Sequence, residues 1–333
     1  MRKLFLALVS LLALTHLPVH ADESAERAKV VQTTIAAFNS GNFNTLEDLS
    51  KKYSTQDKRT KSGAQKISLF DDGISEAIAP PNGTTEEHVK KAVSLTAEWA
   101  KENPTAPLAH ILHASALLEY AYFFRGTGYA NTVSPSGWQG FKKYSRLAAK
   151  YLEDHKDIAS KDTGWHVTMI NIGRSLSFPR KQVMLIASDG LAKNPDDDRL
   201  YYKELESLLP KWGGSTEQVD LFINNAAKNT AKSRGMELYA RLYSAAEESQ
   251  FQERLFVDSK IEWKKMKQGL EDWNRRYPTA WNKNIFGYLA CLAGDKDITK
   301  KNIVEIASDP ILFIWGTNGA ETYNQCKSWA QKA

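Results

Sequence analysis

The sequence predicts an all-α protein, built as a tetratricopeptide-like solenoid of antiparallel helix pairs. Apolar residues recur at the spacing of one helix face, with lysines opposite. Asn103-Pro104, Asn194-Pro195 and Tyr277-Pro278 each end one helix and open the next, at intervals of roughly 80 to 90 residues. Each interval holds four predicted helices, so a helix pair occupies about 40 residues, the length of such repeats. No stretch alternates like a strand over more than a few residues.

The first 21 residues have the layout of a secretory signal peptide. Arg2 and Lys3 precede the apolar run Leu4 to Leu14, and Val19-His20-Ala21 forms a small-x-small cleavage site before Asp22. The run is shorter than the roughly 20 apolar residues that a transmembrane helix needs. We therefore expect a bacterial periplasmic or secreted protein with no transmembrane segment after cleavage.

The charge of the chain gives no reason to expect a nucleic-acid partner. The formal net charge of +5 falls to about +3 once Arg2 and Lys3 are removed. Acidic and basic runs also alternate, as in Asp196-Asp197-Asp198 and Lys264-Lys265. We interpret these runs as solvated helix faces.

Residues 22–82 are expected to form an N-terminal helical region. Glu26 to Tyr53 is typical of a helix hairpin that turns at Gly41-Asn42-Phe43, whereas Arg59 to Pro81 has no clear assignment. Residues 83–333 form the predicted helical-repeat domain. Its first helix is capped by Thr84 or Thr85 and ends at Asn103, before Pro104.

The other predicted helices follow from periodicity and Pro/Gly punctuation. Residues 105–124 are apolar almost all round from Ala114 to Phe124, so this helix should be buried inside the array. Trp138, Trp263 and Trp273 fall on apolar stripes, which favours packing over sugar stacking as the role of the nine tryptophans. The predicted ranges are 105–124, 137–156, 163–174, 178–193, 196–209, 215–231, 233–248, 259–276, 279–293, 296–307 and 319–331.

Leu209 to Glu217 predicts a sharp break between two helices. Pro210 ends the first helix, Gly213 and Gly214 permit the turn, and Ser215 caps the next helix with Gln218 as its partner. Trp212 is left as a large apolar residue in an otherwise polar connection. We expect it to be buried between the two helices.

Two further patterns could indicate a dinucleotide-binding loop and a zinc site, but a structural role explains each of them better. Gly126-x-Gly128 lacks the preceding strand and third glycine of a dinucleotide loop, so it should reverse the chain after a helix ending at Arg125. His110 and His113 share a helix face, but no third zinc ligand accompanies them. We interpret them as packing residues and predict neither a metal nor a cofactor.

The chain has two cysteines, Cys291 and Cys326, both on predicted helices near its C-terminal end. In an oxidising compartment an even pair favours a disulfide between these helices. Two buried free thiols are the alternative.

Arg125-Gly126-Thr127-Gly128-Tyr129-Ala130, with Trp138 and Phe141, and Leu209 to Ser215 carry a resemblance that spans roughly Trp99 to Tyr243. Together with Asn284 to Cys291 and Cys326 to Trp329, this pattern resembles a bacterial domain-of-unknown-function family. Members of that family are similar to secreted or membrane-associated tetratricopeptide-like proteins. The resemblance implies fold and compartment, and supplies no catalytic residue.

The sequence favours a binding module over an enzyme. It contains no G-x-S-x-G, neither cysteine has a catalytic signature, and the carboxylate pairs Asp71-Asp72 and Glu247-Glu248 should diverge on a helix. A protein or peptide partner in the cell envelope is expected on the concave surface. The alternatives are a cell-envelope enzyme, with a site near the Arg125-Gly137 loop or in Arg59 to Pro81, and a purely structural protein. Three convergent titratable groups in a closed pocket would favour the enzyme, and an open groove the binder.

Overall fold

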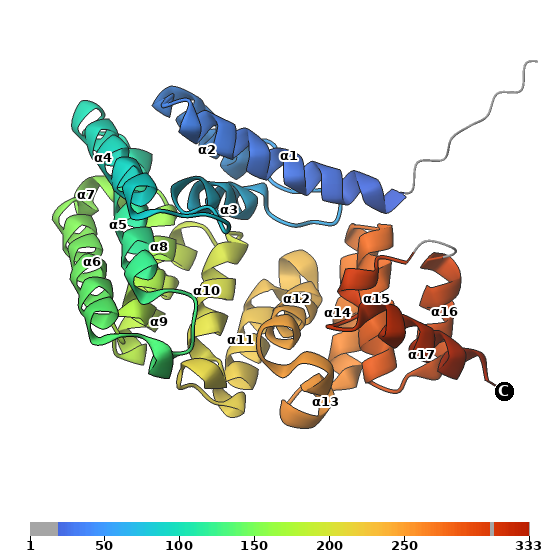
Figure 1. The fold of residues 1–333 in the computed structure, drawn as a ribbon. Coiled ribbons are helices and arrows are strands. Elements are labelled where there is room, and N and C mark those ends of the chain that lie inside the picture. Colours follow the sequence, from blue (N-terminus) through green and yellow to red (C-terminus); the bar gives the residue numbers. More distant parts are fainter. Residues whose placement is uncertain (1–18, 307–309, 333) are drawn as a thin grey trace, which may run out of the picture.

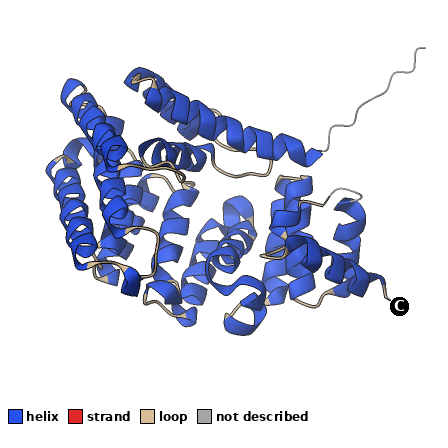
Figure 2. Ribbon diagram, viewed as in Figure 1, coloured by secondary structure: helices blue, strands red, loops and turns tan. Residues whose placement is uncertain are grey.

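A computed structural model describes residues 19–306 and 310–332, and this part of the chain consists of helices and their connections (Figures 1 and 2). These ranges contain no β-strand, and their one isolated β-bridge joins Arg59 and Gln65. Consecutive helices pack against each other along the array, as in a helical-repeat solenoid. The predicted fold class is therefore confirmed. Residues 1–18 of the predicted signal peptide lie outside the described residues.

The helix boundaries follow the predicted punctuation closely, and most differ from it by one to four residues. The α-helices are α1 (Val19–Asn39), α2 (Phe43–Thr55), α3 (Lys66–Ile78), α4 (Glu86–Glu102), α5 (Pro107–Arg125), α6 (Pro135–Asp154), α7 (Lys156–Ala159), α8 (Gly164–Ser175), α9 (Arg180–Lys193), α10 (Asp198–Leu208), α11 (Thr216–Arg234), α12 (Glu237–Ala246), α13 (Leu255–Asp258), α14 (Trp263–Arg276), α15 (Ala280–Leu292), α16 (Lys296–Ile306) and α17 (Gly319–Gln331). A π-helical turn, η3 (Glu247–Phe251), extends α12, and short 3₁₀ turns include η2 (Pro210–Trp212) and η5 (Leu312–Ile314).

The stretch without a clear assignment, Arg59 to Pro81, contains α3. Ile67, Phe70, Ile74 and Ile78 recur at helical spacing and are all buried. Thr85 caps the next helix by accepting a hydrogen bond from the His88 N–H at 3.2 Å. As expected from its apolar surface, α5 lies inside the array and packs against α4, α6 and α8.

The first three helices, α1 to α3, form an arm that crosses the array (Figure 1). At one end α3 contacts α5, and at the other α1 contacts α15. The connection between α2 and α3, residues 56–65, is called the strap here. Its Ser62 carbonyl accepts hydrogen bonds from Trp273 Nε1 and Asn282 Nδ2, each at 3.0 Å. The arm therefore covers the inner face of the solenoid, the concave surface on which the sequence analysis expects a partner.

The interpretation of the acidic run 196–198 as a solvated helix face was wrong for two of its three residues. Asp197 and Asp198 are each only 2% exposed. Asp198 accepts from Arg59 Nη1 of the strap at 2.7 Å and from Arg234 Nη1 of α11 at 2.6 Å. Burial would raise the Asp198 pKa, but the two guanidinium groups outweigh it and lower the pKa to about 2. Asp198 is thus buried where segments far apart in sequence meet, whereas Asp197 pairs with Arg199, two residues further on.

The break at Leu209–Glu217 forms as expected, but Trp212 is not buried. Gly213 has φ of +84°, and the Ser215 hydroxyl caps α11 by accepting from the Gln218 N–H at 3.3 Å. A Cβ on Gly214 would lie 1.7 Å from the Leu208 carbonyl oxygen, so only glycine fits there. Pro210–Trp212 forms a 3₁₀ turn that points the indole outward, where it stays 44% exposed with the Arg174 guanidinium 5.1 Å from its ring centre.

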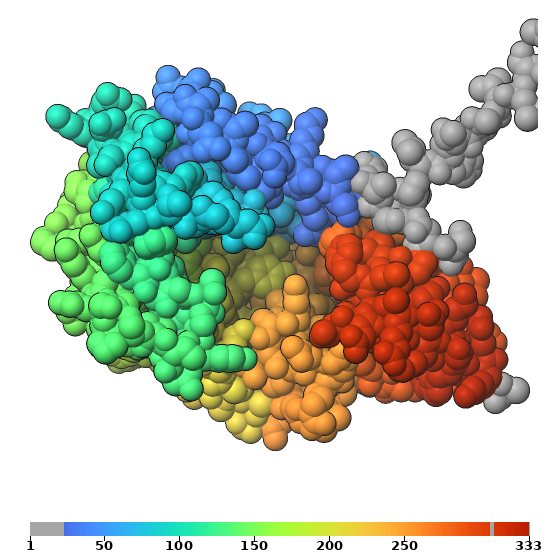
Figure 3. All heavy atoms as spheres, viewed as in Figure 1, coloured from blue at the N-terminus to red at the C-terminus, as the bar shows by residue number. Residues whose placement is uncertain are grey.

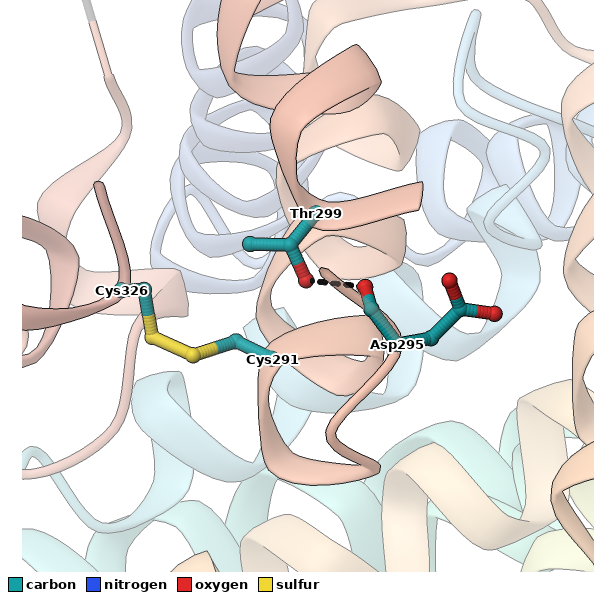
Figure 4. Close-up of a disulfide and its surroundings, with 4 residues drawn as sticks. All are labelled: Cys291, Asp295, Thr299 and Cys326. Carbon is teal, nitrogen blue, oxygen red and sulfur yellow. Dashed lines mark hydrogen bonds between the residues drawn. A yellow bond between two sulfur atoms is a disulfide. The ribbon is translucent and has the colours of Figure 1, made fainter. Parts of the chain in front are cut away.

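Two other expected features have the geometry that the sequence suggested. Gly126 follows the end of α5 with φ of +67°, and Arg125 donates to the Gly126 and Gly128 carbonyls. Cys291 on α15 and Cys326 on α17 form a disulfide, which Figure 4 shows beside the start of α16. Next to it, the Thr299 hydroxyl donates to the Asp295 carbonyl oxygen at 2.8 Å.

Candidate functional site

A cavity of about 500 Å³ lies on the inner face of the array, beneath the arm. Figure 3 shows the molecule hollowed below the arm, toward the middle of the array. Its walls come from the arm, from α10, α12, α14 and α15, and from the segment that follows α16. The volume is that of an ordinary small-ligand pocket. We call it the larger cavity.

One face of each of two helices, α12 and α15, lines the larger cavity along its length. On α12 and its extension, Arg241, Ser244, Ala245 and Glu248 line the wall at spacings of three and four residues, as one helix face. On α15, Trp281, Ile285, Tyr288 and Leu289 do the same. Each face spans seven residues or slightly more, which is about 10 Å along a helix axis. The cavity thus has two distinct ends.

The first end is the arginine end, defined by Arg27 and Arg241. The Arg27 guanidinium lies 4.4 Å from the Trp281 ring centre, and that of Arg241 lies 4.2 Å from the Trp273 ring centre. Arg241 Nε also donates to Glu237 at 2.6 Å. This end lies against the strap, because Trp273 bonds to Ser62 there.

The second end is the glutamate end, defined by Glu247, Glu248 and Glu253. Tyr288 donates to Glu247 Oε1 at 2.6 Å, which couples α15 to the end of α12. Burial raises the pKa of Glu247, the Tyr288 hydroxyl opposes this, and the neighbouring Glu248 and Glu253 carboxylates raise it further. No lysine, arginine or histidine of the described chain lines this end of the cavity. It is a strongly anionic surface.

The backbone of the glutamate end departs from regular helix. The chain widens into the π-helical turn η3 at Glu247, and Gln252 follows with φ of +49°. The wider turn lets Glu247 and Glu248 line the same cavity. The expectation that this adjacent pair would diverge was therefore wrong. A non-glycine residue at positive φ is strained, and such residues concentrate at functional sites.

A smaller cavity of about 280 Å³ adjoins the larger one and shares Ser68, Asp72 and Tyr202 with it. Asp71 and Lys203 also line it. Asp71 accepts from Arg199 Nη1 at 3.0 Å, and this contact joins the arm to α10. Both cavities thus lie along the seam between arm and array.

The residues singled out from sequence fall largely outside this site. The Arg125–Gly137 loop lines neither cavity, whereas Gln65, Ser68 and Asp72 place the other suggested stretch, Arg59 to Pro81, directly on the wall. Trp273 is buried against the cavity, and Trp138 is half-buried beneath the Arg125 guanidinium, 5.9 Å from its ring centre. Trp263 is also half-buried.

The predicted packing histidines have partners on the protein. His110 bonds to the Tyr151 hydroxyl and the Pro104 carbonyl, each at 2.9 Å, and His113 bonds to the Thr96 hydroxyl at 3.2 Å. Within residues 19–306 and 310–332, no group of three or more His, Cys, Asp or Glu side chains is placed to hold a metal ion. Of the described helices, none is long and apolar enough to cross a membrane.

The sequence missed most of the site because its residues come from segments far apart in the chain. Arg27, Arg241, Glu247 and Tyr288 share no local motif. One local signal was present: Glu247-Glu248 stands at the end of an amphipathic helix, five residues before a third glutamate at Glu253.

Comparison of the chain with protein-family models, curated proteins and solved structures found no match in any of the three. The resemblance to a domain-of-unknown-function family therefore stays a prediction, and the cavity is the feature of the molecule that bears on function.

Proposed function

We propose that this chain is an exported helical-repeat binding protein that takes a peptide into the larger cavity. The observation that carries the proposal is the cavity of about 500 Å³ enclosed between the arm and the array. Its aromatic walls, which include Trp273, Trp281 and Tyr288, offer contact area for side chains, and its charged ends offer partners for polar groups.

Most charged groups of the site are already held by the protein, which favours binding over catalysis. Arg241 pairs with Glu237, Asp198 with two arginines, and Glu247 with Tyr288. No described histidine or cysteine lines the larger cavity, so the commonest base and the commonest thiol nucleophile are not among its walls.

The test is retention of peptides by the purified protein. Native mass spectrometry of the protein mixed with a library of random peptides, three to ten residues long, should show bound masses. Ala245→Phe fills the cavity from α12 and should abolish them, while Ala192→Phe, on the exposed side of α9, should not. Retention of no peptide by the wild type, or equal retention by Ala245→Phe, would contradict the proposal.

An enzyme of the cell envelope is the second candidate, and two observations favour it. The first is that Glu247, Glu248 and Glu253 converge at one end of the enclosed cavity, which is the arrangement that the sequence analysis associates with an enzyme. The second is that surrounding protein and the neighbouring Asp71 carboxylate raise the pKa of Asp72, which lines both cavities, to about 6. A carboxyl group with such a pKa can serve as a general acid near neutral pH. Mass spectra of the same peptide library after long incubation would show shortened products if this candidate holds, and intact peptides if it does not.

Export is part of the proposal and has its own support. A disulfide between Cys291 and Cys326 is compatible with an oxidising compartment. N-terminal sequencing of protein recovered from the periplasm or medium should begin at Asp22 or an adjacent residue. An intact Met1 on natively folded protein would remove this part of the proposal.

A further inference from the structure

The larger cavity carries excess charge of opposite sign at its two ends. The ion pairs at and behind the arginine end contain five guanidinium groups. Arg27 and Arg241 line the cavity, whereas Arg59, Arg234 and Arg276 lie outside its lining. The same ion pairs contain three carboxylates, from Glu23, Asp198 and Glu237. Within these pairs the positive charge exceeds the negative charge, and Asp72, which also lines the cavity and interacts with Arg27, adds one further acidic group. The glutamate end has three carboxylates and no basic side chain among its described lining residues.

One buried donor at the arginine end lacks an acceptor. Arg241 is only 4% exposed and lines the larger cavity, yet its Nη2 has no hydrogen-bond partner among the described residues. This nitrogen packs against the strap, where a Cβ on Gly63 would lie 2.4 Å from it, and the strap supplies no acceptor for it. A buried guanidinium nitrogen without an acceptor is costly, and an anionic oxygen would satisfy it.

At the glutamate end the uncompensated charge is negative, and the group that is lacking is a cation. Glu247 is 9% exposed and its Oε1 accepts from Tyr288, while Glu248 and Glu253 remain exposed beside it. Three carboxylates around one aromatic-walled end repel one another, and a cation bound among them would relieve this repulsion. The Tyr288 ring also offers a face to a cation.

We propose that the larger cavity binds a short peptide with free termini, with its carboxylate at the arginine end and its ammonium group at the glutamate end. This inference rests on the proposed function and narrows its ligand. Each terminus of such a peptide meets the charge that the protein leaves uncompensated.

The length of the cavity sets the length of the peptide. Arg241 and Glu248 are seven residues apart on one helix face, which places their Cα atoms about 10 Å apart. An extended chain covers about 3.3–3.6 Å per residue, so a peptide of roughly three residues spans the two ends. Trp281, Ile285 and Leu289 form an apolar wall between the ends, where the peptide's side chains would pack.

The experiment compares three tripeptide libraries of equal composition, mixed with the full-length folded protein and analysed by native mass spectrometry. One library has free termini, one is N-acetylated and one is C-amidated. We expect the free library to be retained, and each blocked library to be retained at least tenfold less. Because no residue of the protein is changed, loss of folding cannot explain the difference.

Two variants assign the ammonium group to its end of the cavity. Glu248→Gln and Glu253→Gln are exposed substitutions, and each should weaken binding of the free tripeptides about tenfold while narrowing the difference between free and acetylated libraries. Glu47→Gln, exposed on α2 and outside both cavities, should bind like the wild type.

Two results would overturn the inference, and both differ from failure of the proposed function. The first is equal retention of free and blocked tripeptides that Ala245→Phe still abolishes, because peptides would then bind in the cavity without using their termini. The second is retention of longer peptides only, with no tripeptide bound. If Ala245→Phe leaves all retention intact, the cavity itself is not the binding site.

Discussion

At the scale of single residues, burial in the fold destabilises the ionised form of Glu204. This residue lies on α10, is 7% exposed, and has no ion pair or side-chain hydrogen bond among the described residues. Burial raises its pKa from 4.5 to about 7. The folded state therefore binds this proton more tightly than the unfolded state, so the contribution of Glu204 to stability is most favourable below pH 4.5 and falls as the pH rises toward 7.

Glu204→Gln should remove this penalty. We expect it to stabilise the protein at pH 8 by about 2–3 kcal/mol and to have little effect at pH 4, because the carboxyl group is then protonated. Denaturant unfolding at both pH values measures this. Glu98→Gln, an exposed change on α4, is the control, and a Glu204→Gln variant no more stable than wild type at pH 8 would contradict the prediction.

Gly214 and Trp212 make a second test at this scale. Gly214→Ala would place a Cβ against the Leu208 carbonyl, and we expect a loss of about 1–3 kcal/mol or more. Trp212→Ala removes a half-exposed indole and its contact with Arg174. We expect this change to lower the free energy of unfolding by about 1 kcal/mol. Thermal unfolding should rank the glycine change as the worse; the reverse order would mean that Trp212 packs more closely than its exposure indicates.

These residues show what sequence reveals and what it does not. The cap at Ser215 and the turn at Gly126 follow from local patterns, which a single stretch of chain determines, and the Cys291–Cys326 pair follows from the cysteine count. The exposure of Trp212 and the burial of Asp198 depend on which segments meet in space. Neither the indole nor the carboxylate carries that information locally.

At the scale of elements, the strap joins the arm to the array through charge. Arg59 pairs with Asp198, which is 2% exposed, and Arg234 pairs with the other oxygen of the same carboxylate. Loss of Arg59 would leave Asp198 with one partner in place of two. Removing one member of a buried pair is costly, although the remaining arginine limits the effect.

We expect Arg59→Gln to cost about 2 kcal/mol and to speed proteolytic cleavage within residues 56–65. Limited proteolysis followed by mass spectrometry of the fragments measures this. Lys58→Gln, the exposed neighbour, serves as the matched control. Equal cleavage of both variants would show that other contacts, such as those of Ser62, hold the strap without Arg59.

The helices themselves were the most predictable elements. Proline boundaries and apolar stripes located the eleven helices predicted between residues 105 and 331 to within four residues, because both signals are local. The arm was the least predictable, since α3 follows an irregular strap. The cavity could not be predicted, because its lining comes from elements as far apart in sequence as α1, α3, α10, α12, α14 and α15.

At the scale of the whole molecule, the disulfide links the last helices of the array. The cysteines are 35 residues apart in sequence, and closing a loop of this size stabilises a protein by about 3–4 kcal/mol in the chain-entropy description. The double variant Cys291→Ala/Cys326→Ala should lose roughly this amount in denaturant unfolding. Wild-type protein with reductant is the companion sample. If the variant and the wild type without reductant unfold together, the bridge adds no stability.

The hydrogen bonds at Ser62 also bear on the order in which the molecule assembles. Its carbonyl accepts from Trp273 and Asn282, partners 211 and 220 residues later in the chain. Contacts of such long range close large loops and form slowly. During synthesis from the N-terminus, the arm is made first, and α14 and α15, which bind the strap, are made near the end. Until α14 and α15 have folded, the inner face of the array stays open to any chaperone or competing chain nearby.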